Sequence, residues 1–190
     1  MVAKHVATPL AVFAAMVAAM VAASTNAVAG APVLRGEWRS AMPEAQGKLF
    51  VTRYFRFNEN RWVLLYRAYA DPEGKLPLFT MNVGGVFVVG GASASVPDAY
   101  ESVFPATRRS ITADSAAGAA LFAPVGCALK IGEPKALLSE SCGFVPSLMS
   151  AMGEYDLVKI SAGQLFFGDR AGDLTKNRPT ALYAFPLIHQ

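Results

Sequence analysis

Residues 48–70 read KLFVTRYFRFNENRWVLLYRAYA, and this stretch carries the clearest periodic pattern in the chain. Mostly apolar side chains occupy every second position from Leu49 to Phe57, and a second run of the same period extends from Trp62 to Ala68. Three polar residues, Asn-Glu-Asn at positions 58–60, separate the two runs. Alternating runs that are rich in aromatic and branched residues around a short polar turn predict a β-hairpin.

Further alternating runs flank this hairpin. After a turn-like Asp-Pro-Glu-Gly at residues 71–74, a long strand is predicted over residues 78–89, in which Gly84 and Gly85 indicate a bend or bulge. Many short strands punctuated by glycine and proline predict an all-β sandwich or barrel. The other predicted strands cover residues 34–40, 100–104, 108–112, 127–131, 155–160, 164–168 and 181–187.

Helical signal is weak by comparison. Asp114 can cap a short helix that reaches Phe122. Pro146 and Ser147 can open a second one before Gly153. The fold class predicted from these patterns is therefore all-β with one or two short helices.

One local motif favours a barrel over a sandwich. Residues 36–38 read Gly-Glu-Trp, and ligand-binding barrels of the lipocalin type commonly start with Gly-x-Trp. In such barrels the indole closes one end, and a late arginine stacks over it as a cation on a π face. We therefore predict a lipocalin-like, partly open antiparallel β-barrel of about ten strands, closed by Trp38 and Arg170. The alternative is a Trp38 that simply packs in a core.

The first 29 residues have the features of an export signal. Lys4 and His5 give a basic start, and residues 10–23 form an unbroken apolar run of 14 residues. Such a run is too short to cross a bilayer, which takes about 20 residues, but it suits a signal-peptide core, and Ala27-Val28-Ala29 suits the cleavage site. We expect residues 30–190 to form one domain in the periplasm or outside the cell, with an uncleaved anchor as the alternative.

Export also indicates the chemical state of the two cysteines. Cys127 and Cys142 lie 15 residues apart, and a pair of cysteines in an oxidising compartment predicts a disulfide that stabilises the fold by about 3 kcal/mol. A reactive thiol is the alternative, but residues 125–129, Val-Gly-Cys-Ala-Leu, offer no base to lower its pKa.

Composition excludes several classes of protein. With 53% hydrophobic and 16% charged residues, the chain is too apolar for a disordered tail. It has 17 basic and 14 acidic residues, and because the basic ones are scattered rather than gathered in a stripe, nucleic acid is not expected as a partner. The chain has two histidines; His5 lies in the predicted signal, and His189, at the end of the chain, is expected to fray.

The sequence shows no convincing pattern of catalytic residues. Glu154 and Asp156 share a face of a predicted strand, and Asp169, Arg170 and Asp173 form the densest charged group, but both sets are interpreted as solvated. We therefore expect no enzyme activity, no metal and no cofactor. An isomerase or cyclase that folds its substrate inside an apolar barrel needs little acid–base apparatus and stays open.

Residues 49–57 followed by Trp62 resemble the opening of the domain found in the adenomatosis polyposis coli down-regulated family, whose animal members are extracellular Wnt antagonists. Residues 77–80, 154–159, 165–170 and 178–187 are similar to later parts of that domain, in the same order. The resemblance implies a lipocalin-like, partly open barrel whose apolar cavity can hold a lipid. Because the chain has length for one barrel and few cysteines, Wnt antagonism is not carried over; the Ala-rich signal indicates a single-domain, bacterial-type relative.

The alternation assigns one face of the strands to the barrel interior. Arg53 shares this face, and a guanidinium there must reach an acid, the barrel mouth or a ligand head group. We expect it either to pair with Asp156, Asp169 or Glu101, or to anchor a lipid head group. The predicted ligand-binding residues are Val51, Arg53, Phe55, Phe57, Trp62, Leu64, Tyr66, Met81, Val83, Phe87, Phe104, Leu165, Phe167 and Tyr183.

These features predict an exported, non-enzymatic protein that holds a hydrophobic ligand, a fatty acid or lipid, inside its barrel. Such a carrier is expected to contact a membrane transiently, with residues 144–152 as a lid. The alternative is a barrel with a filled core that presents its loops to a protein partner.

Overall fold

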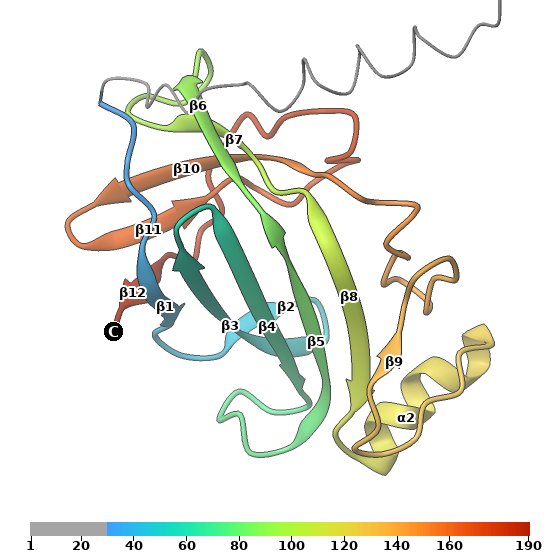
Figure 1. Ribbon diagram of the computed structural model, residues 1–190. Helices are drawn as coiled ribbons and strands as arrows, with labels where there is room; N and C mark the ends of the chain where they lie inside the picture. The colour runs from blue at the N-terminus through green and yellow to red at the C-terminus, as the bar shows by residue number, and fades with distance from the viewer. Residues whose placement is uncertain (1–29) are drawn as a thin grey trace, which may run out of the picture.

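The computed structural model describes residues 30–190, and the predicted signal, residues 1–29, lies outside the described residues. Figure 1 shows antiparallel strands curled into a partly open barrel, with one short helix beside it. The all-β prediction is confirmed. No helix among residues 30–190 has the length and apolar character needed to span a membrane.

Twelve strands of the described part of the chain join in one sheet, in the order β6-β7-β10-β11-β12-β1-β3-β4-β5-β8-β9, with β2 paired to β3. The strands are β1 (Gly36–Ser40), β2 (Glu44–Gln46), β3 (Leu49–Asn58), β4 (Arg61–Tyr69), β5 (Pro77–Val86), β6 (Val88–Ala92), β7 (Tyr100–Val103), β8 (Ala106–Ala113), β9 (Lys135–Ala136), β10 (Tyr155–Ser161), β11 (Gln164–Phe167) and β12 (Leu187–His189). Helix α2 (Ala116–Phe122) runs into a 3-10 turn, η1 (Ala123–Val125).

The predicted hairpin is β3 and β4. Phe57 pairs with Trp62 and Asn58 with Arg61, and Glu59 in the turn adopts the left-handed conformation, with φ of 54°. Residues that alternate along each strand point to opposite faces of the sheet. The apolar face of β3 is therefore buried inside the curl, as the periodicity predicts.

The predicted bend divides the long strand into β5 and β6, and the neighbouring strand divides in the same way into β7 and β8. A Cβ atom on Gly85 would lie 1.9 Å from the carbonyl oxygen of Pro105, so only glycine allows the two backbones to approach this closely. Beyond the bend, β7 leaves β8 to pair with β10. These two bent strands therefore place β6 and β7 at one end of the sheet order and β5 and β8 near the other, so the sheet curls back on itself.

The structure corrects several local predictions. Residues 127–131 form no strand, because Cys127 turns inward to its disulfide and only Ile131 bridges to Ala113. Residues 181–186 are irregular, and β12 begins after Pro186, which has no N–H to donate to a ladder.

Three further corrections concern caps and ends. The predicted helix near Pro146 is a series of turns, in which Arg109 donates to the carbonyl groups of Pro146 and Ser147. Helix α2 is capped by Ser115, whose hydroxyl accepts from the Gly118 N–H, and not by Asp114. His189 is paired in β12 rather than frayed.

Buried side chains form two separate clusters. The first contains both tryptophans and is bounded by β1, β3, β10 and β11; the second lies against α2 and contains the disulfide between Cys127 and Cys142, whose prediction is confirmed. The first cluster comprises Leu34, Trp38, Phe55, Phe57, Trp62, Val83, Phe104, Ala106, Val158, Leu165, Phe167 and Leu187. The second comprises Val51, Ala68, Leu78, Phe79, Ile111, Phe122, Cys127, Leu137, Cys142 and Val145.

Candidate functional site

A cavity of about 520 Å³ lies inside the barrel. Its lining includes four rings of the first cluster and Tyr66, which packs against the second cluster. The cavity therefore adjoins both clusters. Most of the lining is aromatic or aliphatic, with polar groups gathered in two places. The lining residues are Gln46, Arg53, Phe55, Trp62, Leu64, Tyr66, Phe104, Phe144, Glu154, Asp156, Phe167, Arg170 and Tyr183.

Stacked rings form the apolar wall. Phe55 of β3 stacks on Phe167 of β11 at a centroid distance of 4.6 Å, and Trp62 meets Phe104 edge to face at 5.5 Å. The Trp62 indole N–H donates to the Val86 carbonyl at 2.9 Å, so its polar atom is satisfied without a ligand. Leu64 completes this wall, which therefore offers apolar surface alone.

The first set of polar residues on the cavity lining is a hydrogen-bonded relay of uncharged side chains. The Tyr66 hydroxyl donates to the Gln46 side-chain oxygen at 2.6 Å, and the Gln46 amide donates to the Tyr183 hydroxyl at 2.8 Å. Burial raises the pKa of Tyr66 to about 12, so this phenol is neutral at physiological pH. The relay can hydrogen-bond a carbonyl, ester or hydroxyl group without adding charge to the cavity.

Arg53 lies beside this relay, but an acid neutralises it. Its guanidinium donates to both carboxylate oxygens of Glu44, with the closest contacts at 3.0 Å, and stacks over the Tyr183 ring at 4.8 Å. It also donates to the Phe185 carbonyl. The predicted acid partners Asp156, Asp169 and Glu101 are wrong; the pairing role is correct, and Glu44 is the partner.

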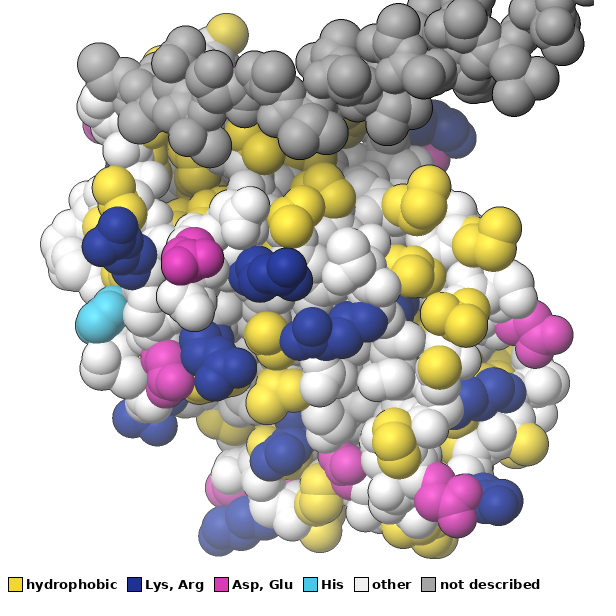
Figure 2. Space-filling view, viewed as in Figure 1, with side chains coloured by type: hydrophobic (Ala, Val, Ile, Leu, Met, Phe, Trp, Pro, Cys, Tyr) yellow, Lys and Arg dark blue, Asp and Glu magenta, His cyan; other side chains and the backbone are white. Residues whose placement is uncertain are grey.

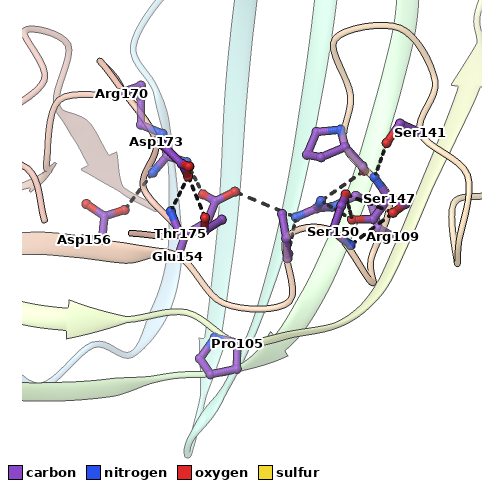
Figure 3. A network of polar contacts seen from close by, with 12 residues as sticks. Pro105, Arg109, Ser141, Ser147, Ser150, Glu154, Asp156, Arg170, Asp173 and Thr175 are labelled. Carbon is purple, nitrogen blue, oxygen red and sulfur yellow. Dashed lines mark hydrogen bonds and ion pairs between the residues drawn. The ribbon is translucent and has the colours of Figure 1, made fainter. Parts of the chain in front are cut away.

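The second polar group is an ionic network around Arg170 (Figure 3). Arg170 donates to Asp156 at 3.0 Å and also pairs with Glu154. The other Asp156 oxygen accepts from the backbone N–H groups of Leu157 and Gly168, at 2.7 and 2.8 Å. Burial raises the pKa of Asp156 to about 6, although Arg170 and these two N–H groups oppose the shift.

The network also holds residues 146–151, the segment between the cavity-lining residues Phe144 and Glu154. Glu154 lies 3.9 Å from Arg109, and Arg109 donates to the carbonyl groups of Pro146, Ser147 and Ala151, as Figure 3 shows for the residues around Arg109. Phe144, just before this segment, lines the cavity and is 66% exposed. The cavity therefore reaches the surface beside Phe144.

The structure does not support the predicted barrel closure. Trp38 is buried against His189, with ring centroids 4.7 Å apart, and its indole N–H donates to the Arg35 carbonyl. Among residues 30–190, the cation–π contacts join Arg53 to Tyr183 and Arg178 to Tyr155, so Arg170 does not stack on Trp38.

The prediction that Asp156 and the residues around Arg170 are solvated is also corrected. Asp156 is buried rather than solvated, and Arg170 pairs with it rather than with its sequence neighbours. Asp173 pairs with Lys176 instead.

The structure brings part of the predicted ligand set together. Arg53, Phe55, Trp62, Leu64, Tyr66, Phe104, Phe167 and Tyr183 line the cavity. Val51 and Met81 belong to the second cluster, whereas Phe57, Val83, Phe87 and Leu165 pack in the first. The predicted ligand set omits Gln46, Glu154 and Asp156, and also Phe144 and Arg170, which are expected in the lid and the barrel closure. The position of Glu154 and Asp156 on one face of the predicted strand is a signal for a site, but the sequence alone favours the interpretation that both are solvated.

A curled antiparallel sheet around an apolar cavity with a few polar groups is compatible with a barrel that binds a small molecule. The chain belongs to the family described as adenomatosis polyposis coli down-regulated 1, whose model matches residues 14–124, more than half of the chain. The match covers β1 to β8 and α2. The Arg170 network and Tyr183 lie beyond it.

Proposed function

We propose that this protein is an exported, non-enzymatic carrier that holds a lipid or fatty-acid chain in the barrel cavity. The observation that carries the proposal is the hollow of about 520 Å³ bounded by Phe55, Trp62, Leu64, Phe104 and Phe167. This volume falls within the roughly 300–1,000 Å³ of small-molecule pockets. The disulfide fits an oxidising compartment, either the periplasm or the extracellular space.

Burial of apolar surface would supply the affinity. Ten methylene groups at about 0.8 kcal/mol each contribute roughly 8 kcal/mol before the entropic losses of binding. Micromolar affinity corresponds to about 8.2 kcal/mol, so a longer acyl chain is needed to exceed it. The stacked rings of Phe55 and Phe167 supply a rigid surface for such a chain.

The charges of the cavity lining favour recognition of the ligand's acyl chain rather than of an anionic head group. Arg53 is paired with Glu44, and Arg170 is paired with Asp156 and Glu154, so both guanidinium groups are already compensated. A free carboxylate would have to displace one of these acids. We infer that the ligand's polar group is uncharged and bonds to the Gln46–Tyr66–Tyr183 relay, or that it stays at the opening beside Phe144.

Loading from a membrane would use Phe144, which lines the cavity, and the exposed apolar residues that follow it in the chain. Phe144, Met149 and Met152 are each more than 60% exposed and lie within or next to residues 146–151, whose carbonyl groups Arg109 binds. Figure 2 shows hydrophobic side chains gathered on the side of the molecule that carries β9 and the loop after it. These side chains could insert transiently into a bilayer surface while the cavity fills.

The test combines extraction with a cavity-filling variant. Lipid extracted from freshly purified protein is identified by mass spectrometry, and binding of a fluorescent fatty acid is measured after delipidation. Leu64→Trp places a larger ring in the cavity and is expected to weaken binding about tenfold or more. Leu65→Trp, on the opposite face of the same strand, is the matched control and should bind normally.

A recurring stoichiometric lipid together with selective loss in Leu64→Trp supports the carrier. Protein that carries no lipid and binds no fatty acid contradicts it, and would favour a barrel that recognises a protein partner. Recovery of a chemically altered ligand would contradict the non-enzymatic assignment.

A further inference from the structure

A second hollow, of about 850 Å³, lies on the outside of the barrel at the end where β3 turns into β4. Four arginines line it, Arg35, Arg56, Arg61 and Arg108, together with the carboxylates of Glu37 and Glu59. We call it the arginine groove. In Figure 2, Lys and Arg side chains cross the face of the molecule formed by β3, β4, β5 and β8 in Figure 1.

The register of the sheet explains why the arginines meet. Arg56 of β3 pairs with Val63 of β4, Val63 with Gly84 of β5, and Gly84 with Arg108 of β8. Residues that are directly paired across antiparallel strands project to the same face, so this row places Arg56 and Arg108 on one outer surface. Arg61, two residues before Val63, projects from that surface as well.

Gly84 lies in the middle of the row and leaves room for Arg108. It has no side chain, and the guanidinium of Arg108 lies over it, 2.7 Å from where a Cβ atom would stand. A larger residue at this position would push Arg108 away from the strand. The glycine therefore lets the Arg108 side chain lie across β5, and Arg108 lines the same hollow as Arg61 and Arg56.

The groove carries an excess of positive charge, because four arginines share it with only two carboxylates, those of Glu37 and Glu59. Among residues 30–190, Arg53, Arg67, Arg109, Arg170 and Arg178 each have an acid within ion-pair distance. The described arginines without such a partner are Arg35, Arg39, Arg56, Arg61 and Arg108, and all of these except Arg39 line the groove. Four guanidinium groups facing two carboxylates, none of them in an ion pair within the described part of the chain, leave a net positive potential that attracts an anion.

We propose that the arginine groove binds the phosphate group of an anionic ligand. Guanidinium groups donate two parallel hydrogen bonds to phosphate oxygens, and several of them can share one phosphate. The groove is large enough for a phosphorylated head group rather than a single ion. The arginines of this groove lie outside the barrel wall and do not line the proposed lipid cavity; Trp62 is the residue that lines both hollows.

Two probes distinguish the sources of the phosphate. Inorganic pyrophosphate, measured by titration calorimetry, tests a soluble ligand, and co-sedimentation with phosphatidylcholine vesicles with and without phosphatidylglycerol tests a lipid head group. The variant is Arg61→Gln/Arg108→Gln. The control is Arg67→Gln/Lys75→Gln, which removes the same charge near the same strands but outside the groove.

We expect the Arg61→Gln/Arg108→Gln variant to lose about tenfold or more in affinity for at least one probe, whereas the control changes little. Loss toward pyrophosphate identifies a soluble phosphate ligand, and loss toward the anionic vesicles alone identifies a lipid head group. If the wild-type protein binds neither probe, or if both double variants weaken binding equally, the site is refuted. Unchanged circular dichroism spectra verify that the exposed substitutions leave the fold intact.

Discussion

Glu44 of β2 and Arg53 of β3 form a buried ion pair in which Nε and Nη2 of the guanidinium each donate to a carboxylate oxygen at 3.0 Å. Both side chains are less than 10% exposed, and the Ser40 hydroxyl donates to Glu44 as well. The pair fixes the short strand β2 to the barrel, next to the cavity relay.

Arg53→Leu should destabilise the protein by about 3–5 kcal/mol, because it leaves the Glu44 carboxylate buried without a counter-charge. Guanidinium denaturation measures the loss. The double variant Glu44→Leu/Arg53→Leu should recover much of it, since both charges are then removed. Unchanged stability in Arg53→Leu with lost fatty-acid binding would instead make Arg53 a ligand anchor.

This pair also shows what could be read from the sequence. Alternation along residues 49–57 placed Arg53 inside the barrel correctly, and the cost of an unpaired interior charge required a partner. The partner was missed because β2 has three residues, too few to show a period. Alternation gives the face of a residue but not its height in the barrel, so Val51 and Met81 were assigned to a cavity that lies beside their cluster.

Asp156 should make stability depend on pH. The carboxyl titrates near pH 3.9 in the unfolded chain and at about 6 in the folded protein, because it is buried. Between these values the folded state binds more protons, so the stability contributed by this group is fully present below about pH 4 and is lost as the pH rises through about 6. The difference amounts to at most about 3 kcal/mol.

Thermal unfolding between pH 4 and 7.5 tests this assignment when wild-type protein is compared with Asp156→Asn, which mimics the protonated form. The advantage of the wild type should shrink as the pH rises through 6. Asp173→Asn is the control that should show no trend in this range, because Lys176 and Thr175 lower the pKa of Asp173 to about 2 and its contribution is lost only below about pH 4. A constant difference between wild type and Asp156→Asn would show that Asp156 stays ionised.

The disulfide should support the second cluster in particular. Cys127 and Cys142 are both buried there, and their bond closes a loop with a sequence separation of 15. Cys127→Ala/Cys142→Ala should lower the free energy of unfolding by about 3 kcal/mol, measured by denaturant titration. Wild-type protein with added reductant should match the variant. Identical midpoints for reduced and oxidised protein would show that the bond does not stabilise the fold.

Gly118→Ala should reverse the usual effect of this substitution in a helix. Alanine is normally favoured over glycine by about 1 kcal/mol in a helix interior, but a Cβ atom on Gly118 would lie 1.6 Å from the Leu78 carbonyl oxygen, which accepts from the Asp114 N–H. The backbone of α2 must therefore move away from β5, and we expect a loss of about 1–3 kcal/mol. Ala120→Gly, at an exposed position of the same helix, should cost about 1 kcal/mol through propensity alone. A higher melting temperature for Gly118→Ala would mean that α2 does not pack this closely on the sheet.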